Sequence, residues 1–161
     1  MSTTYITQII IGITLDKIVK ERKYIKGEIN TYDKYTGKVT GKEKVIKDYV
    51  KMFDNNIFES EWKSDKFSYD KPEIHWWDVF KNYDIDIELF NEDEKTVEII
   101  KYPYEYDIKN IILGRVYKDV ETVFKIDIEK IKKLKEYKIV EKILKEKFNL
   151  IPDILVYKYI S

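Results

Sequence analysis

Two arms of alternating residues on either side of a turn constrain the fold most. Residues 24–32 and 39–50 flank a turn that begins at Asp33 and ends at Gly37. Asp and Gly at these positions suit a type I turn that closes with a glycine in the left-handed region. The second arm alternates in polarity, which gives it one solvent-facing side. The pattern therefore predicts an antiparallel hairpin.

Four further segments are predicted to contain strands. Residues 4–15 begin with alternation and become fully apolar, which is typical of a central strand. Residues 108–120 are apolar in the middle of the segment. Residues 85–102 indicate a second hairpin around an acidic turn at 91–94, and residues 154–160 predict a last strand.

Two of these strands contain the same short pattern. Ile9-Ile10-Ile11-Gly12 resembles Ile111-Ile112-Leu113-Gly114. Four positions are too few to indicate a duplication. The pattern instead predicts two central strands that each need a glycine for close packing or for a bulge.

The strongest helical signal covers residues 127–148. Asp127 is a good N-cap, apolar residues follow at helical spacing, and Asn149 suits the C-cap. A shorter helix is predicted from Pro72 to Phe80 or Tyr83, after an irregular loop at 53–72. Together the elements predict an α+β fold in one domain, residues 1–161. It would hold a mainly antiparallel sheet of about six strands, a long C-terminal helix on one face and a short helix in the middle.

The composition excludes several kinds of chemistry. The chain has no cysteine and a single histidine, His75, so it offers no thiol nucleophile, disulfide or multi-histidine metal centre. No catalytic residue, metal site or cofactor is predicted. Asp84 and Asp86 fit the solvent-facing side of a strand, because metal-dependent hydrolysis would need further carboxylates to converge on them. An enzyme with an unrecognised carboxylate site stays an alternative.

The charges are balanced overall but unevenly spread. Residues 17–51 have a net charge of +6 and residues 84–107 a net charge of −7. This predicts two solvated faces that attract each other, or separate docking surfaces. Only two of the 30 basic residues are arginines and the isoelectric point is about 6.6, so we do not expect nucleic acid as a partner. No apolar run is long enough to span a membrane.

Aromatic residues are the most unusual feature, at 15% of the chain. Adjacent Trp76 and Trp77 cannot both face inward from a helix, and the spacing from Ile74 to Phe80 assigns Trp77 inward and Trp76 outward. Exposed Trp and Tyr are enriched at binding hot spots. We therefore predict a binding surface formed by Trp62, Tyr69, His75 and Trp76. The competing interpretation is that tyrosine merely replaces alanine and that these aromatics pack locally.

The absence of alanine, with few Arg, Gly and Pro, indicates an AT-rich genome such as that of a low-GC bacterium, a phage or a giant virus. The turn Tyr32-Asp33-Lys34-Tyr35-Thr36-Gly37-Lys38 and the composition resemble small proteins of phages and giant viruses, a likeness that implies no function. We expect a small, non-enzymatic, cytoplasmic binding protein. It would occupy a host protein or sequester a small ligand, and a homo-oligomer is compatible with the sequence. A structural or assembly protein is the main alternative.

Overall fold

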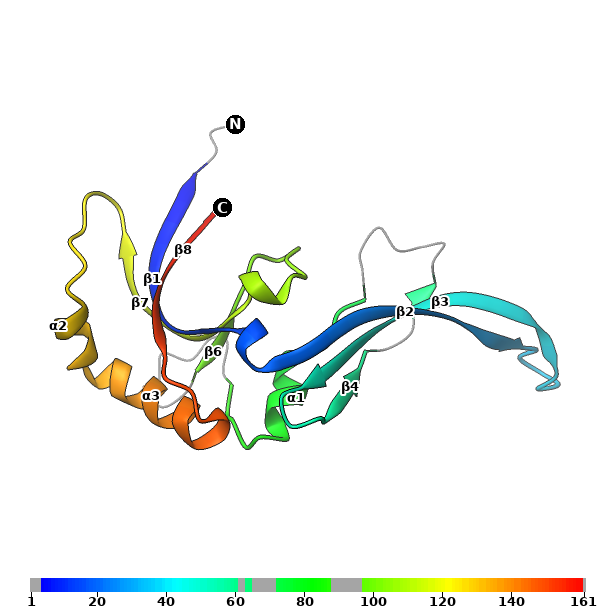
Figure 1. The fold of residues 1–161 in the computed structure, drawn as a ribbon. Helices are drawn as coiled ribbons and strands as arrows, with labels where there is room; N and C mark the ends of the chain where they lie inside the picture. The colour runs from blue at the N-terminus through cyan, green and yellow to red at the C-terminus, as the bar shows by residue number, and fades with distance from the viewer. Residues whose placement is uncertain (1–3, 61–62, 65–71, 88–96, 161) are drawn as a thin grey trace. The chain divides into compact units, whose positions relative to one another are not determined.

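The computed structural model describes residues 4–60, 63–64, 72–87 and 97–160. Its contacts divide the chain into two compact units, one of Met1–Lys17 with Trp76–Ser161 and one of Ile18–His75. In the described residues, each unit contains one antiparallel sheet of four strands (Figure 1). The prediction of one domain over residues 1–161 stays a prediction.

The predicted α+β fold is wrong. The described chain is mostly β, with two antiparallel sheets in place of one sheet of about six strands, and without the long C-terminal helix. The strands separate after the short 3-10 helix η1 (Leu15–Lys17), where the chain leaves one sheet and enters the other. Strand pairing is set by hydrogen bonds between distant segments, which the local alternation of residues does not encode.

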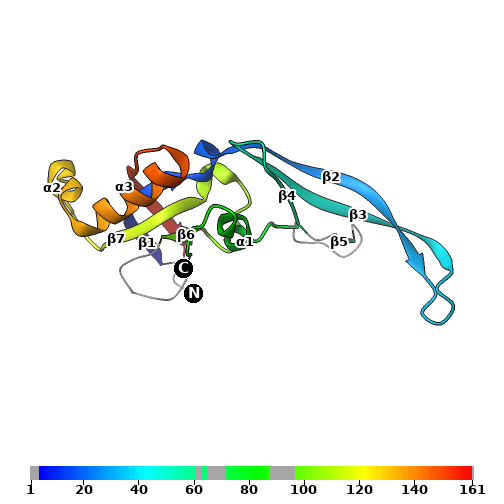
Figure 2. The ribbon, with the colours of Figure 1, turned by 90° about the horizontal axis from the view of Figure 1, so that it is seen from below.

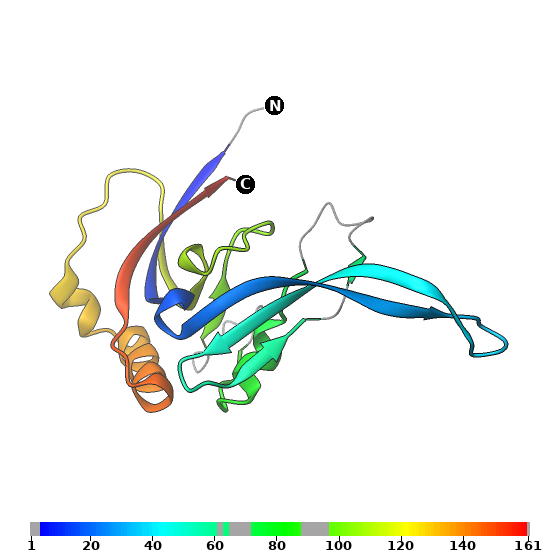
Figure 3. The ribbon, with the colours of Figure 1, turned by 45° about the vertical axis from the view of Figure 1, so that its right-hand side comes forward.

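The first unit contains the sheet β6-β7-β1-β8. Its strands are β6 (Glu98–Ile100), β7 (Ile112–Val120), β1 (Tyr5–Thr14) and β8 (Asp153–Ile160). The predicted central position of the first strand is confirmed, because β1 pairs with β7 on one side and with β8 on the other. Figure 3 shows β8 alongside β1. The predicted strand at 108–120 starts later than expected, after a 3-10 helix η2 (Ile108–Asn110).

The repeated glycines face each other across β1 and β7. Gly12 and Gly114 are register partners, and a Cβ on Gly12 would lie 2.4 Å from the carbonyl oxygen of Leu113. A Cβ on Gly114 would lie 2.1 Å from the carbonyl oxygen of Ile11. Of the two predicted roles for these glycines, close packing or a bulge, close packing is confirmed, since any side chain at either position would collide with the neighbouring backbone.

The predicted helix at 127–148 is broken in two. Helix α2 (Ile128–Lys132) and helix α3 (Lys135–Phe148) are separated at Leu134, whose backbone is extended. Both predicted caps are confirmed: the Asp127 carboxylate accepts a hydrogen bond from the Lys130 N–H, and Asn149 adopts the left-handed conformation. Helix α3 contacts β1 and β7 and buries four side chains, namely Tyr137, Val140, Leu144 and Phe148.

The second unit is built on the predicted hairpin, which is confirmed. Strand β2 (Val19–Tyr32) pairs with β3 (Val39–Met52) through most of their length. The Asp33 carboxylate accepts hydrogen bonds from the N–H groups of Tyr35 and Thr36, and Gly37 has a φ of 70°. Figure 2 shows the hairpin of β2 and β3 continuing past the short strands, which pair with β3 nearer the C-terminal end of β3.

Those short strands correct the prediction of a loop at 53–72. Strand β4 (Ile57–Glu59) pairs with residues 49–51 of β3, and β5 (Lys63–Ser64) pairs with residues 45 and 46. The hairpin predicted at 85–102 is not seen as such. Ile87 and Val97 form an isolated bridge of parallel sense, and the turn predicted at 91–94 lies outside the described residues.

None of the described helices is both long enough and apolar enough to cross a membrane.

Candidate functional site

One face of the sheet in the first unit carries a small apolar cluster. Ile10 of β1, Ile100 of β6 and Ile112 of β7 are buried together there. Three partly buried side chains pack against them: Val116, Leu155 and Tyr157. Residues that point to one face alternate along each strand, so β8 directs Leu155, Tyr157 and Tyr159 to this face and Val156, Lys158 and Ile160 to the other.

A cavity of about 600 Å³ borders this cluster and runs along β8. Consecutive residues 155–160 of β8 line it. Further lining comes from Thr14 of β1, Ile112 of β7 and the segment before β7, namely Tyr102, Glu105, Lys109 and Asn110. Tyr102 and Tyr157 are 55 positions apart in the chain, and they line the same cavity because β8 pairs with β1 at the edge of the sheet.

A second cavity, of about 500 Å³, shares a wall with the first. Tyr102, Tyr157 and Tyr159 line both cavities, and the rings of Tyr157 and Tyr159 are 5.4 Å apart. The second cavity also contains Glu98 and Gln8. The Gln8 side-chain amide donates a 2.9 Å hydrogen bond to the Asp119 carboxylate on the neighbouring strand. We call the two cavities with their three shared tyrosines the tyrosine cleft.

The Tyr157 hydroxyl is held in its protonated form. Burial raises the pKa of Tyr157, the Glu105 carboxylate raises it further, and a hydrogen bond with the Tyr102 backbone opposes the two. A phenol with a raised pKa is neutral at pH 7, where it can donate and accept hydrogen bonds but is not a nucleophile. This tyrosine is therefore suited to contact a ligand rather than to attack one.

Glu98 adds a half-buried carboxyl group to the second cavity. Burial raises the pKa of Glu98, and the positive charge of Arg115 acts in the opposite direction. Arg115 has a buried Nη1 without a hydrogen-bond partner in the part of the chain that the structure describes. The cleft thus combines an apolar floor, aromatic walls and a few charged groups, which is the usual make-up of a ligand site. Within the described ranges, no three or more His, Asp or Glu side chains lie close enough to hold a metal ion.

Of the four binding residues predicted from the sequence, the structure describes His75 and Trp76. Trp62 and Tyr69 lie outside the described residues. His75 is exposed, as expected, whereas Trp76 is buried at 2% exposure and stacks on Phe80 with the ring centroids 6.0 Å apart. Neither His75 nor Trp76 lines the tyrosine cleft.

The expected orientation of the tryptophan pair is reversed. One of the two was expected to be exposed, and it is Trp77, at 43% exposure, instead of Trp76. The reason is the start of helix α1 (Trp76–Lys81), which was predicted at Pro72. Ile74 precedes the helix, so its spacing from Trp77 does not define the buried face of the helix. That face is formed by Trp76, Val79 and Phe80. Whether these residues bind a partner stays a prediction.

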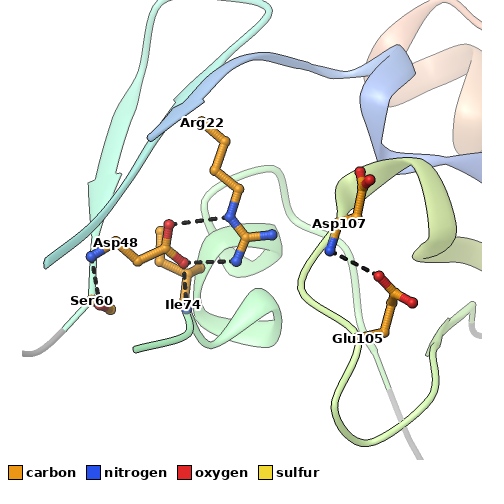
Figure 4. A network of polar contacts seen from close by, with 6 residues as sticks. All are labelled: Arg22, Asp48, Ser60, Ile74, Glu105 and Asp107. Carbon is orange, nitrogen blue, oxygen red and sulfur yellow. Dashed lines mark hydrogen bonds and ion pairs between the residues drawn. The ribbon is translucent and has the colours of Figure 1, made fainter. Parts of the chain in front are cut away.

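A buried ion pair in the second unit was not expected (Figure 4). Asp48 is fully buried and accepts two hydrogen bonds from Arg22, at 3.1 Å from Nε and 2.8 Å from Nη2. The carboxylate also accepts a 3.1 Å bond from the Ile74 N–H, and the Asp48 N–H donates to the Ser60 hydroxyl. These contacts join β2, β3 and two loop residues, and the group has a structural role.

The three tyrosines of the cleft were missed for a simple reason. The chain has 14 tyrosines, and nothing in the sequence separates those of the cleft from the rest. The one local signal is the spacing of two along the last strand, where Tyr157 and Tyr159 share a face with Leu155.

Comparison of the chain with protein-family models, with curated proteins and with solved structures finds no match.

Proposed function

We propose that the chain is a non-enzymatic binding protein and that the tyrosine cleft is its binding site. The observation that carries this proposal is the wall of three tyrosines shared by two cavities over an apolar floor. Cavities of 300–1,000 Å³ with apolar and aromatic linings are typical of ligand sites. Tyrosine supplies a large and rigid contact area together with a polar hydroxyl, which explains its enrichment at binding hot spots.

The charged groups of the cleft limit what it accepts. Glu105, Lys109 and Lys158 line the first cavity, and Glu98 and Lys101 line the second, so each cavity contains charges of both signs. A ligand of high net charge of either sign would meet a like charge in both cavities. The cleft therefore favours an apolar or aromatic group with a polar, nearly neutral remainder. We further propose that the protein acts in the cytoplasm. Reducing conditions there prevent disulfide bonds, and a chain without cysteine does not depend on any.

The test is a nuclear magnetic resonance screen of the full chain against a set of neutral aromatic fragments. We expect fragments to shift the amide signals of Tyr102, Asn110 and Tyr157. Tyr159→Ala should weaken these shifts, and Tyr35→Ala, at an 89% exposed tyrosine of the other unit, should leave them unchanged. If no fragment shifts the cleft signals, or if both variants respond alike, the cleft is not the binding site.

An assembly role is the second candidate, and one observation favours it. Residues 39–44 of β3 pair with β2 alone within the described residues, and the end of this hairpin exposes Ile29, Tyr32, Tyr35 and Val39. A two-stranded ribbon is only marginally stable in water, so contact with another chain would stabilise it. Light scattering after size exclusion tests this: assembly predicts an oligomer that Tyr35→Ser with Val39→Ser dissociates, and a monomer at high concentration contradicts it.

A further inference from the structure

The second cavity lies over the face of the sheet that carries the apolar cluster. Paired residues of neighbouring strands point to the same face, and Ile100 of the cluster pairs with Ile112. Glu98 precedes Ile100 by two residues on β6 and therefore shares this face. Four further lining residues also point there, namely Gln8, Val116, Tyr157 and Tyr159. All four strands of the sheet thus contribute side chains to the cavity.

Glu98 gives the cavity a negative charge that burial makes costly. It is the one carboxylate among the described residues that line the cavity. Burial raises the pKa of Glu98, and a positive charge in the cavity would offset the cost of ionising it. Arg115 follows Gly114, the register partner of Glu98, so it points to the opposite face of the sheet. A positive group in the cavity would therefore meet the carboxylate without displacing Arg115.

The three tyrosines favour a cation over an anion. Lys101 also lines the cavity, so the two charged side chains alone favour neither sign. The π face of an aromatic ring is negative and attracts a cation. Tyr102, Tyr157 and Tyr159 all line the cavity, and the ring centroids of the last two are 5.4 Å apart. Together with Glu98 they make the cavity more favourable for a positive group than for a negative one.

The apolar floor indicates which kind of cation fits. A calcium or magnesium ion needs several oxygen ligands, and a primary ammonium needs three hydrogen-bond acceptors. A quaternary ammonium has no N–H group to satisfy, and its methyl groups are apolar. Aromatic rings are the usual means by which proteins bind such a group. A cavity of about 500 Å³ with Ile100 and Val116 in its lining suits these methyl groups.

We propose that the second cavity binds the quaternary ammonium group of a small ligand, with tyrosine rings against the cation and Glu98 as its counter-charge. This inference rests on the proposed function and names the ligand class for the second cavity. A single positive charge stays within the limit on net charge that the cleft imposes.

The test titrates the full chain with choline and with 3,3-dimethylbutan-1-ol, and follows the amide signals of Ile100 and Val116. The two probes have the same shape, because a carbon atom replaces the nitrogen, and they differ in charge. We expect choline to bind at least about fivefold more tightly. Glu98→Gln should reduce this ratio at least about threefold. Glu129→Gln, at an exposed glutamate of α2 that lines neither cavity, should leave the ratio unchanged.

A second variant tests the aromatic part of the site. Tyr159→Leu keeps an apolar side chain but removes the ring, so it should weaken the binding of choline more than that of the neutral alcohol. Equal weakening of the two probes would show that the ring supplies apolar contact alone and would overturn the inference.

The remaining outcomes separate the inference from the proposed function. Equal affinity for choline and the neutral alcohol would overturn the inference, and so would a ratio that Glu98→Gln and Glu129→Gln change alike. If neither probe binds while neutral aromatic fragments still shift the cleft signals, the inference fails and the proposed function stands. If no compound shifts the cleft signals, both fail.

Discussion

Breaking the ion pair between Arg22 and Asp48 should destabilise the second unit strongly. Asp48 is fully buried and the side chain of Arg22 is 7% exposed, so water cannot replace the lost partner. Asp48→Asn keeps the shape of the side chain but leaves the guanidinium buried without its counter-charge. Removing one member of a buried pair costs about 3–5 kcal/mol, and we expect this cost for Asp48→Asn and for Arg22→Met.

The size of the effect follows from the contacts of the carboxylate. Asp48 accepts two bonds from Arg22 and one from the Ile74 N–H. Arg22→Lys keeps the charge but cannot form the two parallel bonds, and we expect it to cost about 1–3 kcal/mol. The double variant Arg22→Met with Asp48→Leu removes both charges of the pair, and the Ile74 N–H loses the carboxylate that accepts its hydrogen bond. It should cost less than the sum of the two single changes by at least about 2 kcal/mol.

The assay is amide hydrogen exchange along β3, because it reports on the second unit by itself. Protection of the buried Val45 and Val50 should fall in the single variants and recover in part in the double variant. Urea unfolding of the whole chain gives the same comparison as a second measurement. Single-variant costs below about 1 kcal/mol, or a double variant whose cost equals their sum, would show that the pair does not hold this unit together.

Three further tests address the structure. Gly114→Ala should cost about 3 kcal/mol in urea unfolding, because its Cβ would meet the backbone of β1, and a loss below 1 kcal/mol would refute the close approach. Trp76→Ala should cost about 3–5 kcal/mol and Trp77→Ala less than about 1 kcal/mol, and equal costs would contradict the assigned orientation. Burial raises the pKa of Glu98 above its ordinary value of 4.5, so ionising it lowers the stability of the folded state as the pH rises through that range. Glu98→Gln should therefore be more stable than the natural chain at pH 7 and no more stable at pH 4, and a gap that is independent of pH would refute the shift.

The single elements could be predicted from the sequence because their signals are local. Alternation located β1, β8 and the β2–β3 hairpin, and capping residues located Asp127 and Asn149. The break at Leu134 could not be predicted, since no proline or glycine interrupts the helical pattern there. The division into two sheets could not be predicted either, because apolar strands show no sign of which strand they will pair with.

The site was out of reach for related reasons. Tyr102 and Tyr157 meet only when β8 adds to β1, and this contact has no local signature. The tryptophan pair was misassigned because each residue turns a helix by about 100°, so a helix that starts later presents a different stripe. Asp48 did have a signal. Arg22 is one of two arginines in a chain that otherwise uses lysine. An arginine can form two parallel hydrogen bonds with one carboxylate, as Arg22 does with Asp48, and a lysine cannot.

The most direct test of the tyrosine cleft compares Tyr159→Ala with Trp77→Ala for the same bound fragment. Tyr159 lines both cavities, whereas Trp77 is the exposed aromatic of the segment that the sequence favoured. Melting curves first confirm that both variants fold. We predict that Tyr159→Ala raises the Kd by about 30-fold or more, as loss of a hot-spot tyrosine does, and that Trp77→Ala changes it less than about twofold. The opposite pattern would place binding on the tryptophan surface and refute the cleft as the functional site.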